Sequence, residues 1–176
     1  MNTFLRLDQH AMGLHDANDG PISWIRLAAR AVLVDEHGRI AVMHFTRTGS
    51  YKLPGGGIDE GEEHTAALRR ELQEETGYEV ADIKELGAVD ENRYFCGMNQ
   101  ISYCYTARPT HHVGTALTEK EAHEGMNLQW ASSIDEAIAW IESGTTTDED
   151  GSAVGLAMMK ARDCAILRAA QEQLAA

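Results

Sequence analysis

The chain has 176 residues, the length of one ordinary domain, and is long enough to bury about two-thirds of its unfolded surface. Its 28 acidic residues outnumber 15 basic ones and give a formal charge of −13, which argues against binding nucleic acid polymers. Three scattered cysteines, a charged N-terminus unlike a signal peptide and the lack of a long apolar run predict a cytoplasmic protein with reduced thiols and no membrane partner.

The first part of the chain predicts an arm followed by strands. Residues 1–22 are polar and contain turn-forming residues, so we expect an extended arm or one extra strand. Residues 24–35 end in the apolar run of a buried strand, and a turn at 36–38 leads into a second apolar run at 39–46. These two strands are expected to form a hairpin. Leu53–Pro54 marks the end of a short strand, because the residue before a proline favours extended geometry.

A glycine-rich loop and a densely acidic helix follow. Gly55–Gly57 and Gly61 break regular structure, and Gly77 fits the left-handed position that ends many helices. These signals place the helix at about 62–76. Seven of the 28 acidic residues lie between positions 59 and 75, so part of the excess negative charge is concentrated here.

Three glutamates of this helix, Glu71, Glu74 and Glu75, lie at i, i+3 and i+4 and therefore share one helical face. That face borders the apolar stripe of Leu68 and Leu72, which places the carboxylates at the edge of a cleft. Like charges at this spacing repel one another, and partial burial raises both that cost and the carboxylate pKa values. A divalent metal ion among them would offset the repulsion.

Further strands and two helices are predicted after the acidic helix. Residues 79–89, 100–108 and 128–131 have the patterns of strands. Residues 133–143 begin with the Ser-x-x-Glu pattern of a capping box and continue with helical spacing of apolar residues. A last helix is expected at about 151–174, with a stripe formed by Val154, Met158, Ala161 and Ala165. The arm or this last helix is the expected contact of a possible homodimer.

From Gly56 to Tyr78 the chain reads G-x5-E-x7-R-E-L-x-E-E-x-G-Y, and this segment resembles the Nudix box. Only Tyr78 departs from the family's pattern, because it is aromatic where a bulky aliphatic residue is usual. The resemblance implies an α/β fold, a Nudix-type α/β/α sandwich with a mixed β-sheet, with its core at about 23–143. The arm and the C-terminal helix would be additions to one domain.

The resemblance also implies hydrolysis of a nucleoside diphosphate linked to a further group X, with Mg²⁺ or Mn²⁺ required. It implies metal or catalytic roles for Glu71, Glu74, Glu75, Arg70 and Gly56. Glu74 and Glu75 would be the principal ligands, with Glu71 a third ligand or the general base, and the Gly56 carbonyl is a further ligand candidate. Arg70 would do structural work, because it can pair with Glu74 or reach back to Glu62. The general base stays open among Glu71, Glu119, Glu121 and Glu124.

Residues outside the box would select the nucleotide. Arg47 resembles a position that contacts substrate in members acting on nucleoside triphosphates, and Lys52 and Gly55 are placed to contact phosphate. Tyr94 follows the box at the distance of a tyrosine found in dinucleoside polyphosphate hydrolases. Three aromatic residues are candidates either to stack on a base or to fill the core: Phe45, Tyr103 and Tyr105.

The expected function is that of a nucleoside triphosphate pyrophosphohydrolase, with oxidised or non-standard nucleotides as one substrate class. The alternatives are a dinucleoside polyphosphate or nucleotide-sugar hydrolase, and a Nudix domain that binds nucleotide without cleaving it. The last alternative is the weakest, because sensing domains often lose glutamates of the box and all are present here. Proline is absent about fifteen residues after the box, which argues against ADP-ribose.

Overall fold

The computed structural model describes residues 1–146 and 152–175. The strands are β1 Thr3–Asp8, β2 Trp24–Leu33, β3 Ile40–Phe45, β4 Ser50–Lys52, β5 Gly55–Gly57, β6 Tyr78–Arg93, β7 Met98–His112 and β8 Met126–Ala131. The helices are α1 His64–Thr76, a short 3-10 helix at Tyr94–Cys96, α2 Glu119–His123, α3 Ile134–Ser143 and α4 Ala153–Ala175.

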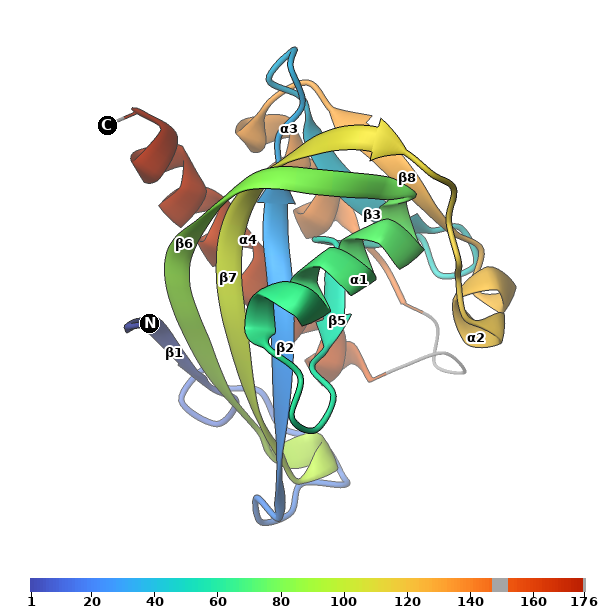
Figure 1. Cartoon of the computed structure of the whole chain (residues 1–176). Helices are drawn as coiled ribbons and strands as arrows, with labels where there is room; N and C mark the ends of the chain where they lie inside the picture. Colours follow the sequence, from blue (N-terminus) through green and yellow to red (C-terminus); the bar gives the residue numbers. More distant parts are fainter. Residues whose placement is uncertain (147–151, 176) are drawn as a thin grey trace.

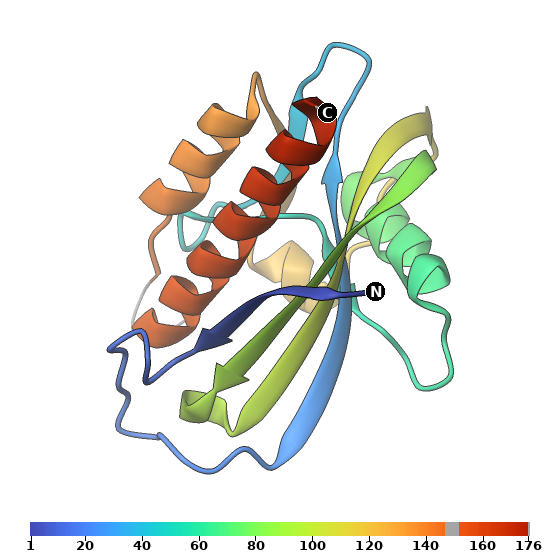
Figure 2. The same cartoon turned by 90° about the vertical axis from the view of Figure 1, so that its left-hand side faces the viewer.

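The strands form two sheets with helices on both sides, as expected for an α/β/α sandwich. The larger sheet has the order β1-β6-β7-β2-β5 and is mixed, because β2 runs parallel to β7 and antiparallel to β5. The smaller sheet has the order β4-β3-β8. Helix α1 covers one face of the larger sheet, and α4 crosses its other face with α3 beside it (Figures 1 and 2).

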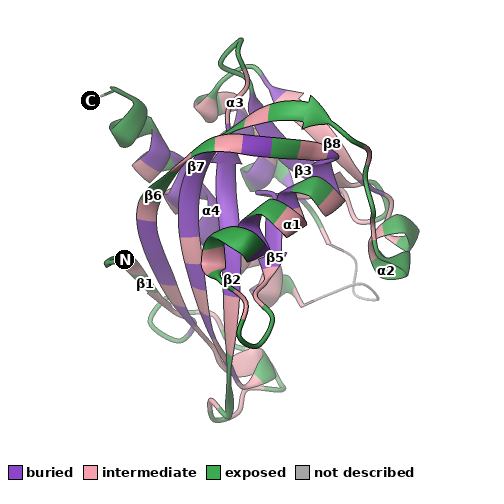
Figure 3. Cartoon of the chain, in the orientation of Figure 1, coloured by how far each residue is buried: buried purple, intermediate pink, exposed green. Residues whose placement is uncertain are grey.

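Strand β2 divides the two hydrophobic cores, because side chains alternate between the faces of a strand. Ala29, Ala31 and Leu33 point to one face and pack with Leu68 and Leu72 of α1. On the opposite face, residues of β2 and β7 pack with α4 in a core that contains Val32, Cys104, Ile166, Leu167 and Ala170. The buried stretches of β2 and β7 stand out in Figure 3. The same alternation sends Arg26 and Arg30 of β2 toward α4.

The predicted hairpin of the first two core strands is wrong. Strands β2 and β3 lie in different sheets and share only an isolated bridge between Val34 and Ile40. Both edges of β2 are occupied, by β7 and β5, so β3 pairs with β4 and β8 instead. The Asp35 carboxylate accepts hydrogen bonds from the backbone N–H groups of His37 and Arg39, which closes the turn locally.

The glycine-rich loop is partly a strand. Residues 55–57 form β5, which pairs with residues 28–30 at the edge of the larger sheet. Gly55 has a φ of 127°, and a Cβ added there would lie 2.2 Å from the Ala29 carbonyl oxygen. Only glycine fits such a close backbone approach at this φ.

Helix α1 begins two residues later than predicted, at His64. Glu62 stays outside the helix because its carboxylate has other partners: it accepts a hydrogen bond from the Asp59 N–H and two from Arg70. The predicted end is confirmed, since Gly77 is in the left-handed conformation and its N–H bonds to the Gln73 carbonyl.

The remaining predicted elements are present with local differences. The arm contributes a strand, β1, parallel to β6, and β6 and β7 are longer than predicted. Ser133 caps α3 through the Glu136 N–H, but the Glu136 carboxylate bonds to Ser132 rather than back to Ser133, so the capping box is only half formed. A complete capping box, between Thr118 and Glu121, begins the unpredicted helix α2.

Helix α4 begins at Ala153, and Gly151, where the prediction starts it, lies outside the described residues. Val154 and Met158 of the predicted stripe are buried, whereas Ala161 and Ala165 are only half-buried. Within the described residues, none of the helices combines the length and apolar character that a membrane crossing requires.

We expect Ile166→Ala to lower the free energy of unfolding by about 2–5 kcal/mol, because Ile166 is a fully buried core residue of α4 and truncating its side chain leaves a cavity. Leu174→Ala is the matched control in the same helix, where the side chain is 52% exposed, and should change stability by less than about 0.5 kcal/mol. Chemical denaturation measures both. Equal effects would mean that α4 does not pack on the sheet in solution.

Candidate functional site

Glu75 is the most deeply buried of the three glutamates on the acidic face of α1. Its side chain is 1% exposed. One carboxylate oxygen accepts a hydrogen bond from the Gly55 N–H at 2.8 Å, and the other lies 2.6 Å from the Lys52 Nζ. Glu75 therefore ties α1 to β5 and to the end of β4.

Glu71 lies directly against the backbone of β5. A Cβ added to Gly56 would come within 2.1 Å of a Glu71 carboxylate oxygen, so the glycine leaves the space that this carboxylate occupies. Burial is the main cause that raises the pKa of Glu71; the hydrogen bond from Arg70 acts against it, and the negative charge of Glu75 adds to it. Glu71 thus has the environment of a carboxylate that gains from a nearby cation.

Arg70 holds the acidic residues in place. Its guanidinium donates to both carboxylate oxygens of Glu62 at 3.0 and 2.9 Å, to Glu71 at 2.8 Å, to Glu74 at 3.3 Å and to the Gly57 carbonyl at 3.0 Å. Both pairings expected for Arg70, with Glu62 and with Glu74, are therefore present. The hydrogen bonds from Arg70 lower the pKa of Glu62 to about 2. A planar fork of this kind restricts the rotamers of its partners.

The carboxylates of Glu71, Glu74 and Glu75 fit a divalent metal ion in chemical type, because they offer only oxygen ligands on one face of a helix. Their charges are now met by Arg70 and Lys52. In the part of the chain that the structure describes, three ligand atoms lie within 4.8 Å of one another in the arm: those of His10, His15 and Asp19. The glutamates of α1 would therefore have to draw together around a shared ion.

The three later candidates for the general base lie on or next to α2 and differ in surroundings. The Glu121 carboxylate accepts hydrogen bonds from the N–H and hydroxyl of Thr118, so it is engaged in capping the N-terminus of α2. Glu119 is exposed in the first turn of the helix. Glu124 lines the cavity described below, and its carboxylate lies 3.7 Å from Lys120.

The predicted substrate contacts do not all converge. Lys52 lines the cavity and contacts Glu75, and the Gly55 carbonyl accepts hydrogen bonds from Lys52 and Arg30. Arg47 is exposed and contacts the His123 ring. The Tyr94 hydroxyl donates to Asp8 at 2.8 Å in the arm, so this tyrosine supports the arm rather than the cavity.

The three aromatic candidates also lie in different parts of the structure. Phe45 lines the cavity, where its ring lies 5.7 Å from the Lys52 Nζ. Tyr103 stacks on His64 of α1, with ring centroids 3.7 Å apart. Tyr105 is buried in the core beneath α1. Phe45 is thus the aromatic candidate placed to meet a ligand in the cavity.

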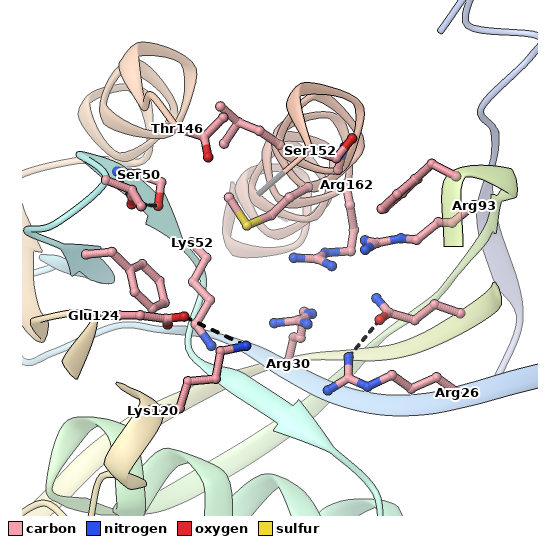
Figure 4. A pocket seen from close by; sticks show the side chains of 17 residues that line it. Arg26, Arg30, Ser50, Lys52, Arg93, Lys120, Glu124, Thr146, Ser152 and Arg162 are labelled. Atoms are coloured by element: carbon pink, nitrogen blue, oxygen red, sulfur yellow. Dashed lines mark hydrogen bonds and ion pairs between the residues drawn. The ribbon is translucent and has the colours of Figure 1, made fainter. Parts of the chain in front are cut away.

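The cavity has a volume of about 470 Å³ and lies between the larger sheet, β3, β4, α2 and α4 (Figure 4). Its wall is strongly basic and includes Arg26, Arg30, Lys52, Arg93, Lys120 and Arg162. The sequence analysis did not single out the four arginines. One signal was available, since Arg26 and Arg30 interrupt a strand that is otherwise mostly apolar, four residues apart and hence on the same face.

Burial and the positive charges of neighbouring arginines lower the pKa values of two arginines of the cavity. Burial and the nearby Arg162 lower the pKa of Arg30 to about 10. Burial, followed by the charges of Arg162 and Arg93, also lowers the pKa of Arg26. Both side chains remain charged at neutral pH, so the cavity presents a concentrated positive charge within an acidic protein.

Comparisons with known proteins converge on one family. The family model described as NUDIX domain matches residues 24–144. The chain is 32% identical over 140 residues to CMP-5'-(N-acetyl-N-hydroxy-3-aminopropyl)phosphonate hydrolase of Streptomyces rubellomurinus, which covers 73% of this chain and 61% of the relative. It is 39% identical over 59 residues to RNA pyrophosphohydrolase of Vibrio atlanticus, covering 34% of each protein. The chain thus spans less than two-thirds of the length of either relative.

The fold has a counterpart among solved structures. A crystal structure of MutT NUDIX hydrolase from Burkholderia pseudomallei superposes with a TM-score of 0.52 and 24% sequence identity, over 64% of this chain and 85% of the other. The likeness supports the α/β/α fold.

We expect Gly56→Ala to weaken Mn²⁺ binding by about tenfold or more, because its methyl group would displace the Glu71 carboxylate and misplaced ligands cost such factors. Gly57→Ala is the adjacent control: the nearest atom to its new methyl group is an Arg26 nitrogen at 3.5 Å, an ordinary contact. Calorimetric titration with Mn²⁺ measures the affinities, and thermal unfolding checks that both variants fold. The same affinity in both variants would exclude Glu71 from the metal site.

Proposed function

The chain belongs to the Nudix family, and from this membership we propose that it is a metal-dependent pyrophosphohydrolase acting on a nucleoside diphosphate linked to a group X. Nucleoside triphosphates are the substrates we place first. One observation carries the proposal: α1 brings Glu71 and Glu75 onto the backbone of β5, while Arg70 holds Glu71 and Glu74. All the glutamates of the box are present, which favours catalysis over nucleotide sensing.

The metal would be held by Glu74 and Glu75, with Glu71 as a third ligand or the base. When bound, Mg²⁺ or Mn²⁺ neutralises charge on the diphosphate and activates water for attack on phosphorus. Lys52 lies beside Glu75 and lines the cavity, so its ammonium group can contact a phosphate oxygen of the substrate. Arg70 is a positioning residue, because it acts through the carboxylates that it binds.

We place the general base at Glu71. Burial raises its pKa, and a carboxylate with a raised pKa accepts a proton more readily near neutral pH. Glu124 is the second candidate, because it is the glutamate of the α2 region that lines the cavity.

The relatives support a nucleotide substrate without choosing one. One is named for hydrolysis of a CMP-linked phosphonate and another for a pyrophosphohydrolase activity on RNA. A nucleotide-linked phosphonate is therefore a second substrate class for this chain, because that relative matches 73% of it. Dinucleoside polyphosphates and nucleotide sugars complete a panel in which release of nucleoside monophosphate with Mg²⁺ is measured. No turnover of any member, in a protein shown to bind nucleotide, would favour a sensing domain.

We expect Glu74→Gln to keep the fold and to reduce turnover by at least about a hundredfold to a thousandfold, because it removes a metal ligand and its charge. Glu63→Gln is the matched control, since Glu63 precedes α1 and its side chain makes no capping hydrogen bond. Steady-state kinetics at saturating Mg²⁺ measure both variants. Undiminished turnover in Glu74→Gln would contradict the ligand assignment.

We expect Arg70→Ala to lower kcat by about a hundredfold, because Glu62, Glu71 and Glu74 would all lose their shared partner. Arg69→Ala is the control one position away. Arg69 is exposed, and its guanidinium donates to the Val80 carbonyl. Its loss should lower stability by about 1 kcal/mol and leave kcat within about twofold. Similar kinetics of the two variants would contradict the role of Arg70.

A further inference from the structure

Besides Lys120 of α2, five cationic side chains from four elements line the cavity beneath α4. They are Arg26 and Arg30 of β2, Lys52 of β4, Arg93 of β6 and Arg162 of α4. Figure 4 shows their charged ends turned toward a common space. The chain has a net charge of −13, so this cavity is a local region of positive charge in an acidic protein.

Three of these cations have carboxylate partners. Arg93 donates twice to a Glu91 oxygen, at 2.6 and 3.2 Å. Arg162 bonds to Asp163 at 2.6 Å and lies 3.7 Å from the other Glu91 oxygen. Lys52 pairs with Glu75, as described above. Their charges are largely met within the protein.

The hydrogen-bond partners of Arg26 and Arg30 among the described residues are neutral. Arg26 donates to the side-chain oxygen of Gln100 at 2.7 Å, and Arg30 donates to the Gly55 carbonyl at 3.1 Å. Arg30 is 5% exposed, and its Nε is buried without any hydrogen-bond partner in the described part of the chain. Two carboxylates whose charges act on them, Asp163 and Glu91, already pair with the other two arginines of the cavity, so an anion in the cavity would stabilise these two guanidinium groups.

We propose that this cavity binds a phosphate-type oxyanion carried by the group X of the substrate. Guanidinium groups donate two parallel hydrogen bonds to phosphate or phosphonate oxygens, and Arg26 and Arg30 lie four residues apart on one face of β2. The inference rests on the proposed function, because X is defined by the diphosphate that it extends.

The cavity adjoins the acidic site. Lys52 belongs to both, because it lines the cavity and lies 2.6 Å from Glu75. Arg30 bonds to the carbonyl of Gly55, and the N–H of the same residue bonds to Glu75. A substrate with its diphosphate at the carboxylates can therefore extend X past Lys52 into the basic space.

Part of the cavity wall lies outside the residues matched by the family model. Helix α4 contributes Leu156, Met159 and Arg162, all beyond residue 144. The C-terminal helix thus completes a cavity whose other walls lie within the matched residues. It should favour an anionic X, such as the third phosphate of a nucleoside triphosphate, over the neutral sugar of a nucleotide sugar.

Binding of inorganic phosphate to the whole chain in EDTA, measured by calorimetry, tests the site without metal or turnover. We expect saturable binding that Arg26→Gln weakens about tenfold, the loss of one charge-assisted hydrogen bond. Arg108→Gln is the matched control, because Arg108 is half-exposed and pairs with Asp82 away from the cavity. Arg26 is chosen over Arg30 because it is only partly buried, so its variant should fold.

Glu74→Gln separates this inference from the proposed function. It should bind phosphate as the unmodified chain does even though its turnover is lost. Phosphate binding that is absent, or that is equal in Arg26→Gln and Arg108→Gln, would overturn the anion site whatever the activity.

Substrate preference tests whether the anion belongs to X. With Mg²⁺, Arg26→Gln should reduce the ratio of kcat/KM for a nucleoside triphosphate over the matching nucleoside diphosphate glucose by about tenfold. An unchanged ratio in a variant that binds phosphate weakly would assign the cavity to free phosphate and overturn the assignment to X.

Discussion

The site depends on how closely α1 approaches the three glycines of β5. The Glu75 carboxylate reaches the Gly55 N–H, and the Glu71 carboxylate occupies the space where Gly56 would carry a Cβ. A side chain at Gly56 would push the Glu71 carboxylate away, and one at Gly55 would collide with the backbone of β2. Because β5 is also the edge strand of the larger sheet, its other side remains within reach of Arg30 and Lys52. A single extended backbone therefore separates the acidic groups from the basic ones.

This separation explains how opposite charges coexist in so small a volume. The peptide groups of Gly55 direct an N–H toward Glu75 and a C=O toward Arg30, so the backbone dipoles are aligned with the field between the two clusters. Arg70 and Lys52 then neutralise part of the acidic cluster, and Glu91 and Asp163 neutralise part of the basic one. Negative charge remains on α1 and positive charge remains in the cavity. A magnesium ion would therefore meet the carboxylates of α1, and a phosphate bound to that ion would meet the cations of the cavity.

The parts of this arrangement that sequence predicts are those with local signatures. The end of α1, its buried leucines and the pairings of Arg70 follow from helical spacing within one segment, and the α/β/α fold followed from the resemblance of that segment to a family motif. The hairpin failed because strand partners are chosen by competition for sheet edges, which no pair of neighbouring strands reveals. The cavity could not be predicted from the sequence for a similar reason. Its four arginines, Arg26, Arg30, Arg93 and Arg162, come from three distant segments, and only folding brings their charges together.

Helix α4 lines part of the cavity, whereas the three glutamates of the candidate metal site all belong to α1. The carboxylates of α1 and the part of the cavity wall that α4 contributes are therefore encoded in separate stretches of the gene. Substitutions at Leu156 or Met159 of α4 would therefore change the lining of the cavity and leave the glutamates of α1 in place.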